Sequence, residues 1–365
     1  FVAIDLMTNA RYGLGRLIRD RDIDLDAFRD WADFCDQDHP LDAAQPLLRW
    51  DGQFDSGQDA IEALAAVFAA GRAVPILTGG KIGVKFQYRD AFERGTGPNL
   101  NQVPERVPVG IISTSSCRSF VTQYTDPSTD PQVIEWAILD RSSDYELRTV
   151  ALEDAGKPTS TLNDRPTQRT FGKLSQQVQG VVRRLQARYE IQLQHNRFRL
   201  SKRSATAQMP IEAMPYEVGD LVLVQHDSLT PGAATTQSFR TRTAGTVSAV
   251  VVSKAIEVTG ANPKTDFGVW LFGTDGVEKQ LTANYASPTS IAEGGTLNLW
   301  DPVALTPATV TIQKGTQVIC GPFDSTRQIY EITGLTTEQP LTRTIELEEW
   351  HPEMFDMPDS FDEGD

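Results

Sequence analysis

The side chains that could act in acid–base or nucleophilic catalysis lie along this chain without the spacing of a known catalytic motif. Residues 113–117 read Ser-Thr-Ser-Ser-Cys and offer nucleophiles, but the Gly-x-Ser-x-Gly turn that exposes a hydrolase serine is missing. Cys117 could act with a histidine only if the fold brought a distant one beside it. The four histidines stand singly, at His39, His195, His226 and His351. We therefore predict no catalytic residue.

Metal-ligating residue types are present, but not in metal-binding patterns. Asp36, Asp38 and His39 are close in sequence, yet their spacing is neither that of an EF-hand loop nor that of a zinc protease. We interpret them as polar groups at the end of a helix. The cysteines form no Cys-x-x-Cys pair and stand at Cys35, Cys117 and Cys320. Free thiols in a reducing compartment are expected, and neither a metal ion nor a cofactor is predicted.

Several carboxylates could form the acid–base pair of a glycosidase. The candidates are Asp140, Asp144, Glu146, Glu153 and Asp154. The separation of such a pair decides its chemistry, and sequence does not give that separation. We interpret these residues as the solvated face of a hairpin. A hydrolase of cell-wall polysaccharide and a carbohydrate-binding β module remain the alternative functions.

Two glycine-containing stretches are fragments of phosphate-binding loops. Residues 13–15, Gly-Leu-Gly, lack the third glycine and the strand–turn–helix context of a dinucleotide-binding motif. Residues 79–81, Gly-Gly-Lys, lack the upstream glycine and the serine or threonine of a P-loop. Both stretches are predicted to be turns.

Charge argues against a protein that wraps DNA. The formal net charge is -15, whereas phosphate neutralisation requires lysine and arginine. The one basic cluster, 195–199 with Lys202 and Arg203, contains an aromatic residue and could hold a single strand. An edge-strand charge that prevents aggregation, or a contact between subunits, is the simpler interpretation. An acidic surface would also suit a channel wall past which DNA slides.

The first part of the chain predicts a small α+β domain, residues 1–108. Amphipathic spacing indicates helices over 24–38, with Asp24 as N-cap, and over 57–70, with Ser56 as N-cap and Ile61, Leu64, Ala65 and Phe68 buried. Strands at 74–77 and 82–86 are joined by two glycines, which is typical of a tight hairpin. Residues 89–108 are predicted to be a loop.

The remainder predicts mainly β structure. Residues 109–212 are expected to form a mixed β domain with one long helix over 173–189, and strands resume from about 191. Residues 213–345 are expected to form a β-barrel or sandwich, because short apolar runs alternate with turn residues. The acidic residues 346–365 are predicted to be a linker. The fold class is therefore α+β and mainly β, in a multidomain protein.

Length agrees with this division, since 365 residues suggest two or three domains. No run of ~18 apolar residues indicates a membrane-spanning helix. The sequence begins with Phe1 rather than methionine, followed by alternating apolar residues. We therefore expect it to be a segment of a longer protein.

Two early motifs resemble one family. Residues 6–15, Leu-Met-Thr-Asn-Ala-Arg-Tyr-Gly-Leu-Gly, and 34–37, Phe-Cys-Asp-Gln, resemble the tail tip attachment, or host-specificity, proteins of lambda-type bacteriophages. The likeness continues in the same order along the chain. It includes the apolar helix face at 60–68, Val-Pro-Ile-Leu at 74–77, Gly-Lys-Ile at 80–82, Val-Gly-Asp-Leu-Val at 218–222 and Gln-Ile-Tyr-Glu-Ile at 328–332.

The resemblance implies a structural virion protein and no enzyme. It would form the central hub of a tail tip as a homotrimer, with barrels and α+β domains around a passage. Implied partners are sister copies, the distal tail protein, the tape measure protein and an iron–sulfur tail-tip protein. DNA would pass through without specific binding during ejection. Host attachment would use a receptor-binding part outside this sequence, and assembly would take place in the host cytoplasm.

Overall fold

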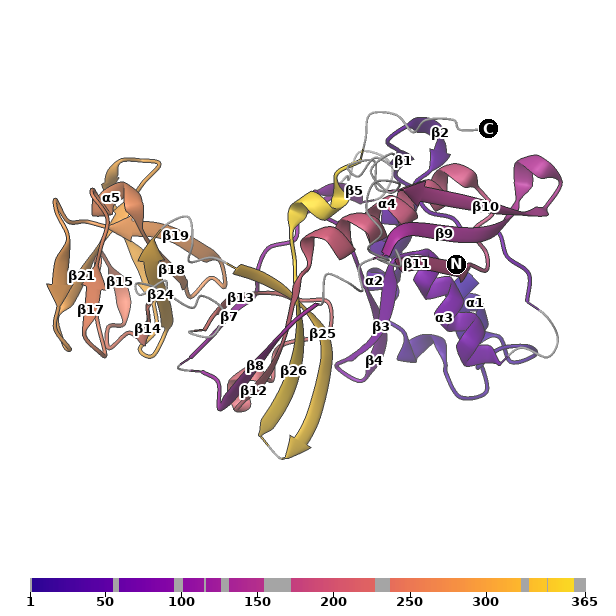
Figure 1. The fold of residues 1–365 in the computed structure, drawn as a ribbon. Helices are drawn as coiled ribbons and strands as arrows, with labels where there is room; N and C mark the ends of the chain where they lie inside the picture. Colours follow the sequence, from indigo (N-terminus) through magenta and orange to yellow (C-terminus); the bar gives the residue numbers. More distant parts are fainter. Residues whose placement is uncertain are drawn as a thin grey trace, which may run out of the picture. The chain divides into compact units, whose positions relative to one another are not determined.

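The computed structural model describes residues 2–54, 59–94, 101–114, 116–125, 131–153, 172–226, 237–322, 328–339 and 341–357. Most elements of this part of the chain are strands, and five are α-helices, so the fold is mixed α+β (Figure 1). None of these helices is long and apolar enough to cross a bilayer.

Contacts group the chain into two compact units that do not follow sequence order. The first unit combines residues 1–106, 125–202 and 351–365, and the second combines 107–124 and 203–350. Each unit is therefore assembled from segments that are distant in sequence. The borders of the three domains expected from the sequence remain predictions.

Three helices of the first unit come from its N-terminal segment: α1 (Val2–Thr8), α2 (Leu25–Cys35) and α3 (Ala60–Ala70). The Asp24 carboxylate accepts hydrogen bonds from the N–H groups of Asp26 and Ala27, as predicted for an N-cap. In α3 the cap is Asp59, and Ser56 lies outside the described residues. Ile61 and Ala65 were expected in the core but are exposed, Ile61 to 69%. The buried stripe of this almost entirely apolar helix runs instead through Ala63, Leu64, Val67 and Phe68.

A hairpin follows α3, as the sequence predicts. Strands β3 (Ala73–Thr78) and β4 (Lys81–Phe86) pair antiparallel, and Gly79 and Gly80 between them have φ values of 60° and 79°. Positive φ at both turn residues is the geometry that matches the twist of a two-residue hairpin. The loop expected at 89–108 is partly wrong, because β5 (Phe92–Arg94) and β6 (Asn101–Val103) pair within it. Two further short strands, β1 (Asp38–His39) and β2 (Asp42–Pro46), follow α2.

The helix predicted over 173–189 is wrong for residues 173–183, and only 184–189 are helical. Residues 172–177 form strand β11 (Gly172–Gln177), which lies beside β9 (Pro131–Asp140), and β9 also pairs with β10 (Glu146–Glu153). Helix α4 (Arg184–Leu200) begins only after this strand and occupies the stretch from 191 to 200 that was expected to be β. Gly180 separates the two elements with φ of 84°, and its Cα packs against the ring of Trp50, where a side chain would collide.

A six-stranded sheet of the second unit has the strand order β7-β13-β25-β26-β12-β8. Its strands are β7 (Gly110–Ser113), β8 (Ser119–Tyr124), β12 (Arg203–Met209), β13 (Leu221–Gln225), β25 (Gln328–Gln339) and β26 (Thr342–Glu349). Its two edge strands, β7 and β8, are thus supplied by the short segment 107–124, while the other four come from 203–350.

The other large sheet runs β14-β24-β18-β19-β21-β16 with β22 beside β21. These strands are β14 (Gln237–Arg240), β16 (Ala249–Val251), β18 (Phe267–Phe272), β19 (Glu278–Ala283), β21 (Thr296–Asp301), β22 (Thr306–Pro307) and β24 (Gln317–Pro322). Short pairs and a short helix accompany it: β15 (Gly245–Val247) with β23 (Val310–Ile312), β17 (Ile256–Val258) with β20 (Thr289–Ile291), and α5 (Pro263–Asp266).

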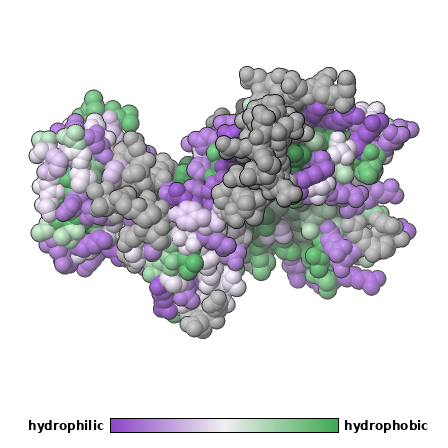
Figure 2. Space-filling model, in the orientation of Figure 1, coloured by the Kyte–Doolittle hydropathy of each residue, from purple (hydrophilic) through white to green (hydrophobic). Residues whose placement is uncertain are grey.

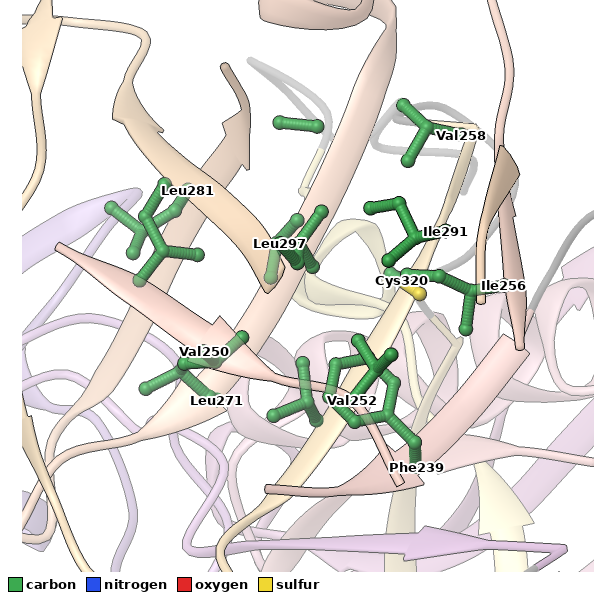
Figure 3. Packing of buried hydrophobic residues seen from close by; sticks show 14 of the residues in the cluster. Phe239, Val250, Val252, Ile256, Val258, Leu271, Leu281, Ile291, Leu297 and Cys320 are labelled. Carbon is green, nitrogen blue, oxygen red and sulfur yellow. The ribbon is translucent and has the colours of Figure 1, made fainter. Parts of the chain in front are cut away.

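One hydrophobic core is shared by these strands (Figure 3). It includes Phe239, Leu271 and Leu297 from the large sheet and Ile256 and Ile291 from the β17–β20 pair. A barrel or sandwich was expected here. Among the described residues the sheet is curled and open, since β14 and β16 end the path of paired strands. The short pairs contribute apolar side chains to the same core.

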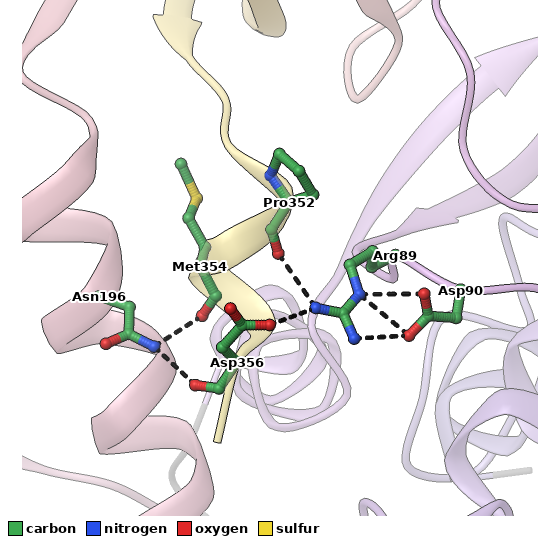
Figure 4. A network of polar contacts seen from close by, with 6 residues as sticks. All are labelled: Arg89, Asp90, Asn196, Pro352, Met354 and Asp356. Carbon is green, nitrogen blue, oxygen red and sulfur yellow. Dashed lines mark hydrogen bonds and ion pairs between the residues drawn. The ribbon is translucent and has the colours of Figure 1, made fainter. Parts of the chain in front are cut away.

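The acidic linker predicted at 346–365 is wrong for the residues that the structure describes. Residues up to Glu349 belong to β26, Trp350 is buried, and a 3₁₀ helix (Pro352–Phe355) follows. The Asn196 amide of α4 donates hydrogen bonds of 3.0 and 2.8 Å to the carbonyl oxygens of Met354 and Asp356 (Figure 4). Arg89 also donates to the Asp356 carboxylate, so this segment is packed into the first unit. Residues 358–365 lie outside the described part.

Candidate functional site

The histidines and cysteines suggested by the sequence are built into packing. His39 is buried with its ring edge-on to Tyr189, and His226 stacks on Phe120 with ring centroids 4.3 Å apart. Burial raises the pKa of the Cys35 and Cys320 thiols to about 12 and that of Cys117 to about 11. Such thiols remain protonated at neutral pH and are poor nucleophiles. Among the described residues, no three histidine, cysteine or acidic side chains are grouped to hold a metal ion.

The serine-rich segment before Cys117 forms a turn. The Ser116 hydroxyl accepts a hydrogen bond from the Ser113 N–H at 2.9 Å and donates one to the Ser113 carbonyl at 3.0 Å. The side-chain amide of Gln317 contacts the Ser113 hydroxyl. Ser115 lies outside the described residues. The Ser116 hydroxyl therefore has its partners within the turn, and the Ser113 hydroxyl has a partner on β24.

The candidate carboxylates that the structure describes differ in burial and in partners. Asp140 is buried, so its assignment to a solvated face was wrong, while Asp144 and Glu146 are exposed as expected. Glu146 forms an ion pair with Arg148, and Asp144 has φ of 55° in the connection between β9 and β10. The side chains of Glu153 and Asp154 lie outside the described part. What remains is a structural carboxylate, Asp140, and exposed acids on a hairpin.

The Gly-x-Gly stretch at 13–15 closes the end of α1. The Gly13 and Leu14 N–H groups donate to the carbonyls of Asn9 and Leu6 at 3.0 and 2.8 Å. A side chain at Gly13 would collide with the Leu6 carbonyl, and one at Gly15 with the Thr8 carbonyl. The prediction of a turn is confirmed, and glycine is required because the backbone folds back so closely.

The basic cluster at 195–203 is not an edge strand. Residues 195–199 belong to α4, where His195 and Asn196 are buried and Arg199 is exposed. Lys202 donates to the Phe198 carbonyl at 2.7 Å, and the Arg203 guanidinium lies 5.7 Å from the Tyr124 ring centroid. The cluster is therefore divided between the end of α4 in the first unit and the start of β12 in the second.

A second group of basic residues, which the sequence did not mark as a site, lines a cavity of about 810 Å³ in the first unit. We call this cavity the arginine basin. It lies where β2, the end of β9 and the start of α4 meet. The charged residues that line it are Arg49, Arg141, Arg183, Arg184, Arg188 and Asp140. Arginines from three distant segments thus converge, and only the short spacing of 183, 184 and 188 was visible beforehand.

Two carboxylates fix part of the arginine basin. Asp51 accepts from Arg49 at 2.9 Å and lies 3.6 Å from the Arg183 guanidinium. Asp140 accepts from the Ser142 N–H and hydroxyl at 2.8 and 2.7 Å and from Arg184. Although burial acts to raise it, these hydrogen bonds and the Arg184 charge hold the pKa of Asp140 below its ordinary value. Asp140 is therefore a carboxylate that positions Arg184.

The positive charges of the arginine basin also repel one another. Burial, and then the charges of Arg49 and Arg141, lower the pKa of Arg183 against the opposing attraction of Asp51. Arg141 and Arg188 form no ion pair with any carboxylate in the described part of the chain. Within the described residues the basin therefore carries two cationic groups that form no ion pair, in a protein whose formal net charge is -15.

A smaller apolar cavity of about 190 Å³ lies between α1, α2 and α3. Its lining includes Trp31, Trp50, Val67 and Cys35, with Arg49 and Asp36 as the charged residues. The Trp31 indole N–H donates to the Gly71 carbonyl at 2.8 Å, so its polar atom already has a partner. This cavity offers no polar group arranged for chemistry.

Several apolar side chains are exposed on both units. Leu139 and Leu147 are directly opposite each other on β9 and β10 and are 50% and 60% exposed. In the second unit Val303 is 92% exposed. Figure 2 shows hydrophobic and hydrophilic residues interspersed over the visible face. Such positions are common on surfaces, and a paired set like Leu139 and Leu147 suits a contact with another protein.

Comparison with known proteins gives distant structural likenesses. No protein-family model and no curated protein sequence matches the chain. A chain of the virion of a native gene transfer agent particle is 10% identical with a TM-score of 0.31, covering 70% of this chain and 41% of that one. The tail protein from Neisseria meningitidis MC58 is 10% identical with a TM-score of 0.31, covering 80% and 67%.

A third structure, the 43 kDa tail protein of prophage MuSo2 from Shewanella oneidensis, is 8% identical with a TM-score of 0.32 and covers 83% of this chain and 58% of that one. The chain thus spans less than two thirds of the gene transfer agent and MuSo2 chains. Similarities of this size establish neither a shared fold nor a shared function.

Proposed function

We propose that this chain is a structural protein of a phage tail or a phage-like particle, and that three copies form the central hub of the tail tip. The observation that supports the proposal is that the residues of the two early motifs pack within the fold. Gly13 and Gly15 pack against the carbonyls that end α1, and Phe34 packs against Phe86 and Phe92 with ring centroids 5.2 and 5.5 Å away. These residues serve packing, whereas an enzyme signature would converge on a reactive cleft.

The later motifs support the same interpretation. Val222 of the 218–222 motif and Ile332 of the 328–332 motif are fully buried in the core of the six-stranded sheet. Tyr330 is buried beside them. The motifs by which this sequence resembles the tail tip attachment proteins therefore supply residues of the hydrophobic core, as expected of a structural protein.

A hub requires contacts with copies of itself and with other proteins. In a closed ring of three, each copy contacts the next through two different surfaces. Exposed apolar side chains such as Leu139, Leu147 and Val303 are suited to such contacts. The proposed partners are sister copies, the distal tail protein, the tape measure protein and an iron–sulfur tail-tip protein, in a particle assembled in the host cytoplasm. DNA would leave through the channel after a receptor is bound elsewhere.

The first test is the oligomeric state of the expressed chain. Mass photometry and electron cryomicroscopy should show a trimer or a ring with an open centre. A monomer that persists at micromolar concentration, together with absence from the tail tips of purified particles by immunogold labelling, would contradict the proposal. Release of sugars from peptidoglycan that is lost in Asp144→Asn would support a hydrolase, and glycan binding by a monomer would support a carbohydrate-binding module.

A further inference from the structure

The arginine basin carries an inference that does not depend on the proposed tail function. We propose that it binds the phosphoryl oxygens of a phosphate-bearing ligand. The cavity is lined by five arginines and one aspartate, and the Asp140 carboxylate already accepts hydrogen bonds from Ser142 and Arg184. An anion would thus meet guanidinium groups without meeting a free carboxylate among the lining residues.

The arginines differ in how firmly they are held. Arg49 and Arg183 share Asp51, and Arg184 is fixed by Asp140. These three are positioned before any ligand arrives, which reduces the entropy lost on binding. Arg141 and Arg188 line the same cavity and have no ion-pair partner in the described chain. An anionic ligand would neutralise the charges of these two arginines, so they should contribute most to its affinity.

Phosphate fits the chemistry of the basin better than a single carboxylate. Guanidinium groups form paired N–H bonds to phosphate oxygens, and several of them can surround one tetrahedral group. Helix α4 is 17 residues long, and its first residues line the basin. The Arg183 side chain does not cap this helix, so the positive end of the helix dipole adds to the positive potential in the basin. The volume of about 810 Å³ lies within the range of small-ligand sites and would admit pyrophosphate or a nucleotide.

Mutual repulsion supports the same conclusion. The pKa of Arg183 is lowered by burial and further by the charges of Arg49 and Arg141, although Asp51 opposes this. A bound phosphate would place negative charge among these three groups and relieve the repulsion. Phosphate binding should weaken with added salt, because dissolved ions can enter the basin and screen the arginine charges.

The test is isothermal titration of the full chain with inorganic pyrophosphate, in the wild type and in Arg141→Gln and Arg188→Gln. Neither arginine has an ion-pair partner among the residues that the structure describes, so replacement of either should leave the fold intact. Each change should weaken pyrophosphate binding about tenfold, the worth of one charge-assisted hydrogen bond. Arg148→Gln is the matched control, since Arg148 is an exposed arginine on β10 outside the cavity lining.

Further arms distinguish the source of the phosphate and the rival anion. A single-stranded oligonucleotide that binds more tightly than pyrophosphate, and loses that advantage in Arg188→Gln, would identify a nucleic-acid backbone as the source. Equal or weaker binding would identify an isolated phosphate or nucleotide. Three results would overturn the proposal. They are the absence of saturable binding, the same pyrophosphate affinity in Arg141→Gln and Arg188→Gln as in the control Arg148→Gln, and tighter binding of a glutamate peptide than of pyrophosphate. None of these outcomes depends on whether the chain forms a trimer.

Discussion

A buried ion pair distinguishes the first unit from the apolar core of the open sheet in the second unit. In the first unit, charged groups lie inside: Arg72 and Glu190 form an ion pair at 2.8 Å with side-chain exposures of 3% and 10%. The core of the open sheet in the second unit consists of apolar side chains, and Arg242 and Glu293 of that unit form an exposed ion pair. Burial of apolar area stabilises a fold without fixing one arrangement, whereas a buried ion pair penalises every arrangement that separates it. We therefore expect the first unit to be the more sensitive to changes of charge.

The largest effect should follow from removing one partner of the buried pair. Glu190→Leu leaves the Arg72 guanidinium buried without a carboxylate, although it still lies 4.4 Å from the Tyr189 ring centroid. We expect a loss of about 3–5 kcal/mol in the free energy of unfolding of the first unit. Denaturant titration, read out by hydrogen exchange of α4, would measure it.

The double variant Arg72→Met with Glu190→Leu is the control for this interpretation. It replaces the pair by apolar groups of similar size, so most of the lost stability should return. A double variant as unstable as the single one would show that the pair acts through packing alone.

A comparable but chemically different loss is expected in the second unit. Leu297 is fully buried in the core of the open sheet, so Leu297→Ala removes apolar contacts and leaves a cavity. The expected cost is about 2–5 kcal/mol, with no dependence on pH or salt. Leu305→Ala, at an exposed leucine, should change stability by no more than about 0.5 kcal/mol. Similar losses for both variants in thermal unfolding would refute the assignment of this core.

A smaller, pH-dependent effect is expected at His39. Burial lowers the pKa of His39, and the Arg72 charge acts in the same direction while Asp42 opposes it. The His39 Nδ1 accepts a hydrogen bond from the Leu41 N–H at 3.2 Å, which requires the neutral ring. Below the ordinary value of about 6.5 the unfolded chain binds a proton that the folded unit does not, so stability falls with pH by up to about 1.4 kcal/mol per unit.

This dependence should end once the pH passes below the folded pKa of His39. In His39→Gln it should be absent between neutral pH and that point, while His226→Gln, in the second unit, should leave it unchanged. Unfolding curves of the first unit measured at a series of pH values would decide this, and an identical slope in His39→Gln would rule out the assignment.

The smallest effect should come from the exposed pair of the second unit. Arg242 and Glu293 lie 2.6 Å apart with side chains 52% and 61% exposed, so solvent and salt screen their attraction. Arg242→Gln should change the free energy of unfolding by less than about 1 kcal/mol. A loss as large as that in Glu190→Leu would remove the contrast between the units.

Sequence alone could predict those parts of the fold that local chemistry determines. Asp24 begins α2 and Gly79-Gly80 closes the β3–β4 hairpin because each acts on neighbouring backbone groups. The helix expected at 173–189 failed because apolar residues spaced for a helix continue from β11 into α4 across Gly180, whose positive φ the pattern did not reveal. Pairing of β11 with β9, more than 30 residues away, decided the outcome.

The arginine basin could not be predicted from local sequence patterns, for a related reason. Arg49, Arg141 and Arg184 are ordinary surface residues in sequence, and only the packing of three distant segments makes them lining residues of one cavity. The same holds for Arg72 and Glu190, which are 118 positions apart. Predicting either feature would need the pairing of β9 with its neighbours and the start of α4, and the latter was wrongly placed.

The interleaving of the two units along the chain has a genetic consequence. The polypeptide passes from one unit to the other at 106–107, 124–125, 202–203 and 350–351. The short segment 107–124 of the second unit supplies both edge strands of the six-stranded sheet. A single crossover in the coding sequence for residues 107–350 would therefore leave both units with segments from two different parents. Exchange of either unit as a whole would need breakpoints at all of these passages, so the pair should be inherited together.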